Sequence, residues 1–273
     1  MKSSSQWIVL PLLFLSSIFT ATAQTSKAEL DLGVAAYKDA RYEEAIRHFQ
    51  KAVDLDSGNI NARMYLATAS LSQYIPGVDT QENKLMAEQA VDQYKQVLDS
   101  DAPRDQKINC AKGIAYVYLN LKKLDDSRKY YQMASDYEPD DPEPYYSLGA
   151  LDWTECYQAR MSERAKLGLK PGENLNPQNP DQKRVCDDLK DKNWSRILHG
   201  IEMLKKAINL RPAYDDAMAY MNLMYREKAD VECNDLAARE QDLKTADEWV
   251  DKTLGFKKAK ANKSADPTAP NPQ

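Results

Sequence analysis

The chain has 273 residues, with 37 Lys and Arg against 42 Asp and Glu, which gives a formal net charge of −5 at pH 7. This balance argues against a broad nucleic-acid interface, because such an interface needs basic residues gathered on one face. Only 9 residues are Gly, and this scarcity favours long helices.

The first segment, residues 1–23, has the features of a secretory signal peptide. Lys2 supplies a positive start, Trp7 to Phe19 form a mostly apolar core, and Ala21 to Ala23 form a small-x-small cleavage site. We expect cleavage after Ala23 and export, with a periplasmic or secreted mature chain. The alternative is an uncleaved membrane anchor, but the apolar run is shorter than the about 20 residues that a membrane-spanning helix needs.

Residues 26–59 predict two helices, at about 27–39 and 42–54, joined by a short turn. Gly33 and Ala45 are small where the two helices must approach closely, and Tyr42, Phe49 and Leu55 are large where the core must be filled. In chain order, the pair Leu32-Gly33 is followed by Ala45, Phe49 and Ala52. Their spacing resembles the 34-residue helix–turn–helix pattern of the tetratricopeptide repeat. A single unit of this kind cannot bury its apolar face alone, so we expect it to stack on further units.

Four further units follow the same pattern with two interruptions. We place them at residues 60–101, 108–141, 142–212 and 215–254, the last helix acting as a polar cap on the stack. The second unit has a long internal turn. The fourth holds an insertion at 156–194, in which 156–167 prolong the first helix and 181–191 form a short helix of their own. Residues 256–273 are charged and Pro-rich, and we expect a disordered tail there.

The resemblance implies an all-α, right-handed α-solenoid of about five helix pairs over residues 24–255. In such repeats the first helix of each pair lines a concave groove that binds other proteins. Carried onto this sequence, the groove residues are Tyr37, Met64, Leu71, Lys112, Tyr116, Tyr146, Trp153 and Leu223. Aromatic residues are frequent anchors of interfaces. The alternative is that some of these side chains pack against a neighbouring repeat.

A two-carboxylate clamp for an acidic C-terminus, known in this family, is not predicted. The clamp needs Lys, Arg and Asn residues from several repeats, whereas Asn109, Lys112 and Asn120 all come from one repeat.

The four cysteines are Cys110, Cys156, Cys186 and Cys233, an even number in a chain that we expect to be exported. Cys156 and Cys186 bracket the insertion, so their pairing is favoured, with Cys233 as a competing partner for Cys186. Cys110 is expected to be a small buried residue. The spacing matches neither a haem-attachment motif nor a zinc site, and we expect no cofactor and no metal.

The function that these patterns favour is a non-catalytic protein-binding adaptor or scaffold of the cell envelope, whose protein or peptide partner is unknown. One alternative is a structural component of an envelope complex that assembles through its convex or end surfaces. A less favoured one is an enzyme that uses residues 156–194 as a lid, with Arg160, Arg164, Asp187 and Asp188 available there. That reading lacks a nucleophile or metal pattern, and His48 and His199 are expected to lie far apart.

Overall fold

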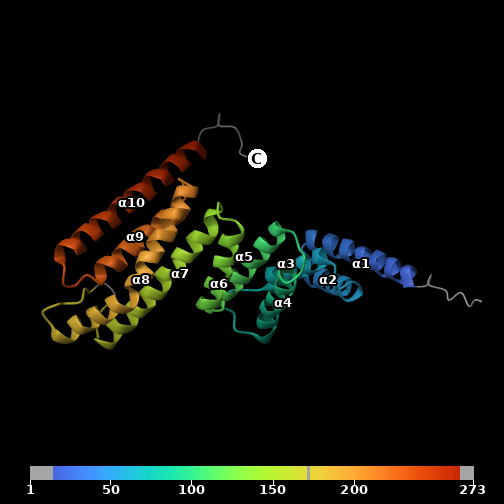
Figure 1. Cartoon of the computed structure of the whole chain (residues 1–273), viewed down its shortest axis with the longest axis horizontal. Coiled ribbons are helices and arrows are strands. Elements are labelled where there is room, and N and C mark those ends of the chain that lie inside the picture. The colour runs from blue at the N-terminus through green and yellow to red at the C-terminus, as the bar shows by residue number, and fades with distance from the viewer. Residues whose placement is uncertain (1–14, 171–172, 265–273) are drawn as a thin grey trace, which may run out of the picture. The chain divides into compact units, whose positions relative to one another are not determined.

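A computed structural model describes the backbone of residues 15–170 and 173–264 and the side chains from residue 25 to 258, apart from residues 171 and 172. Within these residues the chain forms ten α-helices and no strand, so the all-α prediction is confirmed. The chain divides into two compact units, residues 1–123 and 124–273. Figure 1 labels the helices along the chain.

Unit 1 contains α1 (Leu15–Lys38), α2 (Tyr42–Leu55), α3 (Ile60–Gln73), α4 (Gln81–Leu98) and α5 (Arg104–Asn120). Its first core lies where α1 and α2 pack together and α3 closes over them, around the fully buried Phe49. Gly33 allows this close approach, because a Cβ atom there would lie 2.5 Å from two ring carbons of Phe49. Gly33, Ala45, Phe49 and Ala52 therefore meet in this core, whereas Leu32 is 52% exposed.

The long turn between α3 and α4 is held by the buried Asn83. Its Oδ1 accepts from the backbone N–H of Ile75 at 2.7 Å, and its Nδ2 donates to the carbonyls of Ile75 and Val78 at 2.8 and 2.7 Å. Gly77, with φ of +82°, makes the turn that these bonds fix. The interruption of the second repeat is thus an ordered loop.

Unit 2 contains α6 (Leu124–Tyr137), α7 (Pro142–Lys166), α8 (Pro180–Leu210), α9 (Asp215–Asp230) and α10 (Leu236–Ser264). The first helix of the insertion does prolong α7, as predicted. The separate short helix predicted at 181–191 is wrong, because these residues begin the 31-residue α8. Buried residues recur at helical spacing through that segment, at Cys186, Leu189, Asn193 and Ile197, so nothing ends the helix there.

The tail predicted from residue 256 onward is wrong for its first part. α10 continues to Ser264, because Lys and Ala are good helix formers and no Pro occurs before Pro267. Residues 265–273 lie outside the described part. Most of the predicted signal peptide, residues 1–14, also lies outside it, and its cleavage stays a prediction. No helix among the described residues combines the length and apolarity needed to cross a membrane.

Candidate protein-binding faces

A cluster of aromatic side chains lies on the first helices of the two pairs in unit 2. We call Tyr146, Trp153 and Tyr157 of α7, together with Tyr220 of α9, the aromatic face. The Tyr220 ring meets Tyr146 at 5.6 Å and 79°, and Trp153 at 5.5 Å and 83°. Trp153 also stacks on Tyr157 at 5.0 Å. These edge-to-face and stacked contacts hold the rings in fixed orientations.

The rings remain partly open to solvent. Tyr157 is 37% exposed, and Tyr146, Trp153 and Tyr220 are half-buried against the core of unit 2. Leu223, also half-buried, follows Tyr220 one turn later on α9. Three predicted groove residues, Tyr146, Trp153 and Leu223, therefore come from the two helices that form one surface. A preformed aromatic surface of this kind can bury partner side chains at a small ordering cost.

One end of the aromatic face is anchored by Tyr214, the residue before α9. Its ring lies 5.0 Å from that of Tyr146, and its hydroxyl donates to the Glu143 carboxylate at 2.6 Å. Arg211 donates to the same carboxylate at 2.7 Å. Burial raises the pKa of Tyr146 to about 12 and raises that of Tyr214 as well, so both phenols stay neutral at physiological pH. These contacts join the start of α7 to the start of α9.

The five other predicted groove residues lie in unit 1, on α1, α3 and α5. Tyr37 shares a hydrogen bond of 2.9 Å with Ser72, and Met64 receives one of 3.2 Å from the Cys110 thiol. Leu71 and Lys112 are half-buried, whereas Tyr116 is 42% exposed. Tyr37 and Met64 thus already engage neighbours, as the packing alternative anticipated, and Tyr116 is the most accessible anchor in this unit.

The arginines of the insertion form ion pairs that join α7 to α9. Arg160 donates to both carboxylate oxygens of Glu227, at 2.6 and 2.8 Å, and lies 3.0 Å from Asp230. Arg164 reaches the same Asp230 at 3.4 Å. Glu227 is only 2% exposed, and burial raises its pKa while the Arg160 hydrogen bonds lower it. These contacts give the two arginines a structural role in holding α7 against α9.

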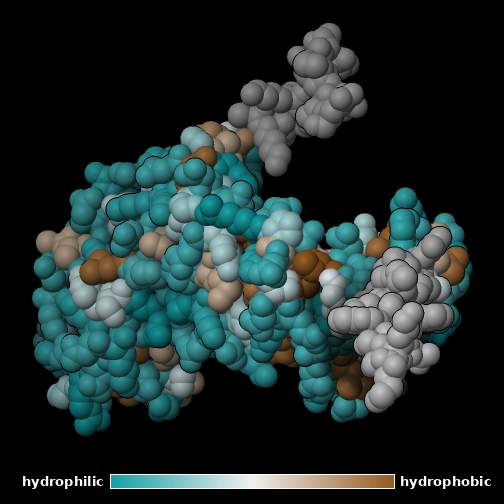
Figure 2. Space-filling view, turned by 45° about the vertical axis from the view of Figure 1, so that its right-hand side comes forward, coloured by the Kyte–Doolittle hydropathy of each residue, from teal (hydrophilic) through white to brown (hydrophobic). Residues whose placement is uncertain are grey.

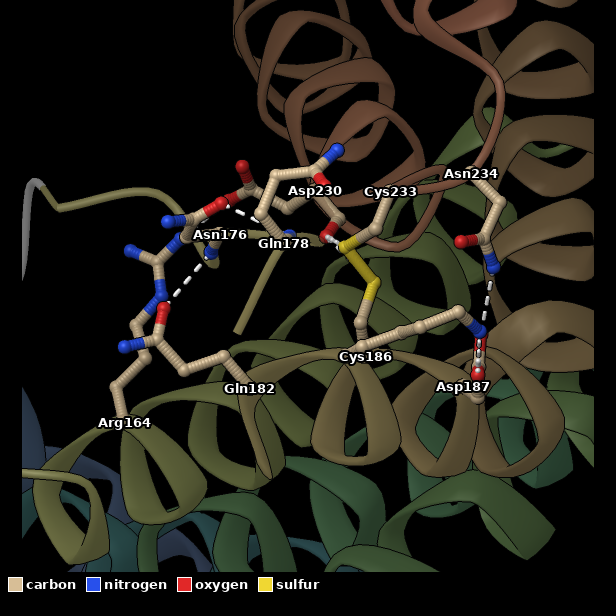
Figure 3. Close-up of a disulfide and its surroundings, with 10 residues drawn as sticks. Arg164, Asn176, Gln178, Gln182, Cys186, Asp187, Asp230, Cys233 and Asn234 are labelled. Carbon is tan, nitrogen blue, oxygen red and sulfur yellow. Dashed lines mark hydrogen bonds and ion pairs between the residues drawn. A yellow bond between two sulfur atoms is a disulfide. The ribbon is translucent and has the colours of Figure 1, made fainter. Parts of the chain in front are cut away.

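The disulfide joins Cys186 to Cys233, so the predicted pairing of Cys156 with Cys186 is wrong (Figure 3). Cys156 is free and fully buried on α7, where burial raises the pKa of its thiol to about 12. Cys233 lies in the connection between α9 and α10 and meets the extended α8 there. Asp187 accepts from Asn234 at 2.7 Å beside it. The pairing depends on the length of α8, which the sequence did not reveal.

Sequence reasoning also missed a charged network around Asp152 of α7. The Asp152 carboxylate, nearly fully buried, accepts from Arg128 at 2.7 Å and pairs with His199 Nδ1 at 2.6 Å. The hydrogen bond with Asp152 is the main reason why the pKa of His199 is raised. The partners lie 24 and 47 residues from Asp152 in the chain, so no local motif signals them. Among the side chains that the structure describes, no group of His, Cys, Asp or Glu could hold a metal ion.

The surface outside these faces is mostly polar. Figure 2 shows hydrophilic residues over most of the visible side, with hydrophobic residues in small separate patches. The exposed large apolar residues include Ile75, Val78 and Leu85 of unit 1 and Leu198 of unit 2. Scattered apolar residues of this kind are normal on protein surfaces.

Comparison with known proteins agrees with this architecture. Residues 27–59 match the family model described as Tetratricopeptide repeat. A stretch of 109 residues is 33% identical to the Protein STIP1 homolog of Dictyostelium discoideum, which corresponds to 40% of this chain and 18% of that protein. The chain therefore matches less than a fifth of that relative's length.

Two solved structures show the fold. The crystal structure of MamA protein is similar with a TM-score of 0.58 and 15% identity, over 91% of this chain and 99% of that one. The crystal structure of YrrB, a TPR protein with an unusual peptide-binding site, is similar with a TM-score of 0.54 and 14% identity, over 91% and 98% of the two chains. At this identity the likeness establishes a fold of stacked helical hairpins like that of tetratricopeptide-repeat proteins.

Proposed function

We propose that this protein is a non-catalytic scaffold that binds a protein or peptide partner through the first helices of its repeats. The observation that carries the proposal is the aromatic face, where Tyr146, Trp153 and Tyr220 hold one another in place while remaining partly open to solvent. Rigid Tyr and Trp side chains lose little entropy when a partner covers them. The fold shared with YrrB, described as having a peptide-binding site, supports the same reading.

Unit 1 contributes a second contact surface around the exposed Tyr116 of α5. Lys112, one turn earlier on α5, and Leu71 of α3 are half-buried and add basic and apolar character to the first helices of this unit. Export to the cell envelope, inferred from residues 1–23, remains part of the proposal and supplies the oxidising setting in which the Cys186–Cys233 disulfide forms.

The test is a binding titration with the partner recovered by cross-linking the protein in its own cell. Trp153→Ala and Tyr116→Ala should each weaken binding by at least about 1–2 kcal/mol, as buried aromatic anchors do. The matched controls are Arg47→Ala on α2 and Lys205→Ala on α8, which remove exposed charges from second helices. Circular dichroism should show that all four variants stay folded. Loss of binding in the controls but not in the aromatic variants would favour assembly through the convex surfaces instead.

A further inference from the structure

Two arginines of the chain lie over rings at the two ends of the aromatic face. At one end, the guanidinium carbon of Arg160 is 5.3 Å from the centre of the Tyr157 ring. At the other end, that of Arg211 is 4.4 Å from the centre of the Tyr214 ring, which anchors the face. Such contacts are attractive because the face of an aromatic ring carries negative charge density. The chain itself thus places a cation at each end of this surface.

The three rings between these ends, Tyr146, Trp153 and Tyr220, are called the central rings here. Among the side chains that the structure describes, no cation lies over any of them. The Tyr220 ring is nearly perpendicular to the other two, at 79° and 83°. An edge-to-face pair leaves a corner beside the edge, and a cation in such a corner contacts both rings. The central rings are partly open to solvent, so a cation from another molecule can reach them.

A carboxylate lies beside the central rings. Asp216 is exposed in the first turn of α9, four residues before Tyr220, and residues at this spacing share one helix face. Burial is the main reason why the pKa of Tyr146 and that of Tyr220 are raised, and the negative charge of Asp216 adds to the effect at both. Asp216 forms no ion pair with any other described side chain. Its charge is therefore available to a ligand on these rings.

The summed charge at this end of the face favours a cation. The starts of α7 and α9 each carry about half a positive charge from their backbone dipoles. Asp215 and Asp216, both in the first turn of α9, supply two negative charges, which exceed that sum. The Glu143 carboxylate in the first turn of α7 is offset by Arg211. The local balance is negative, which complements a basic side chain and opposes an acidic one.

We propose that the aromatic face binds a basic peptide segment of the partner, with one Lys or Arg side chain lying among the central rings and its charge facing Asp216. This inference deepens the proposed function and rests on it for the choice of the face as the contact surface. Arginine is the commoner cation in such contacts. Leu223, three residues after Tyr220 on α9, offers apolar contact to the residues that flank the basic side chain.

The experiment titrates the full chain, labelled with fluorotryptophan and observed by fluorine NMR, with a short peptide of Gly and Ser around one central Arg. The control peptide carries citrulline in place of Arg, which keeps the shape and removes the charge. The arginine peptide should move the Trp153 resonance, assigned with Trp153→Phe, in a saturable way and leave Trp249 in place. The citrulline peptide should bind at least about fivefold more weakly. An equal response to both peptides overturns the proposal, as does no response to the arginine peptide up to about 10 mM.

Variants of the protein separate the cation contact from apolar packing. Tyr220→Leu removes one ring and keeps apolar bulk, so it should weaken binding of the arginine peptide about three- to tenfold, whereas Tyr220→Phe should retain it. Asp216→Asn should weaken binding about threefold at low salt and less at high salt. Its matched control is Glu202→Gln, which removes an exposed carboxylate from α8 of the same unit and should have no effect. Equal effects of the two charge changes contradict the role given to Asp216.

These titrations use no native partner, so their outcome is independent of the test of the proposed function. If the arginine peptide fails to bind while Trp153→Ala still loses the partner, the face is the contact surface and the basic ligand is wrong. If the arginine peptide binds as expected while Trp153→Ala keeps the partner, the cation site stands and the proposed function fails.

Discussion

Replacing Gly149 by Ala tests the close contact of α7 with α8, on which the geometry of unit 2 depends. A Cβ atom at this position would lie 2.5 Å from Cγ of the fully buried Leu204, 2.9 Å from its Cδ2, and 3.1 Å from the carbonyl oxygen of Gly200. The last contact is with backbone and cannot be relieved by a rotamer change. Overpacking of this kind costs about 1–3 kcal/mol.

The same change also carries a gain, because Ala is favoured over Gly in a helix interior by about 1 kcal/mol. Gly255 supplies the matched control, since it lies in α10 of the same unit and a Cβ atom there would meet nothing within 4 Å. Gly255→Ala should therefore stabilise, and the two variants should differ by about 1–3 kcal/mol in urea unfolding followed by circular dichroism. Equal effects at both positions would refute the packing of α7 on α8.

Three further predictions concern the buried charges and the disulfide. Glu227→Ala should lower the free energy of unfolding by about 3–5 kcal/mol, because it leaves Arg160 buried without its bidentate partner. The double variant Arg160→Met with Glu227→Leu should recover much of that stability in a double-mutant cycle. Peptide mapping without reductant should find Cys186 bound to Cys233, with Cys110 and Cys156 free, and four free thiols in the exported protein would contradict this pairing. Cys233→Ser should lower the free energy of unfolding by about 4 kcal/mol, the value that the chain-entropy model gives for a closed loop of 47 residues. The free energy of unfolding should fall as pH rises from about 5 to 8. His199 has a raised pKa, so its contribution to stability is complete below the unfolded value near 6.5 and is lost at higher pH, and burial raises the pKa of Glu232 to about 7, so that folding favours its protonated form. His199→Gln and Glu232→Gln should each flatten this pH dependence, and an unchanged slope in both variants would rule these groups out as its source.

The sequence predicted those contacts and helices that depend on residues close to one another in the chain. Gly33, Ala45 and Phe49 meet as their spacing required, and the first helix of the insertion does extend α7. The partner of Cys186 was missed because the pairing depends on the full length of α8. Residues 181–191 were predicted as a separate short helix, because only their packing on the core shows that they continue into α8. The sequence predicted part of the aromatic face, since Tyr146 and Trp153 follow from the repeat register. Tyr220 was not identified, because its role arises from how α9 lies on α7.

Site-specific photo-crosslinking tests the central claim, that the first helices of the repeats bind the partner. A photoreactive phenylalanine placed at Tyr157, 37% exposed on α7, is compared with the same group at Leu198, 43% exposed on the neighbouring α8. In unit 1 the matched positions are Tyr116, 42% exposed on α5, and Leu85, 48% exposed on α4. The account predicts a discrete cross-linked product in the native host from positions 157 and 116 and not from 198 and 85. Products from 198 or 85 alone would contradict it.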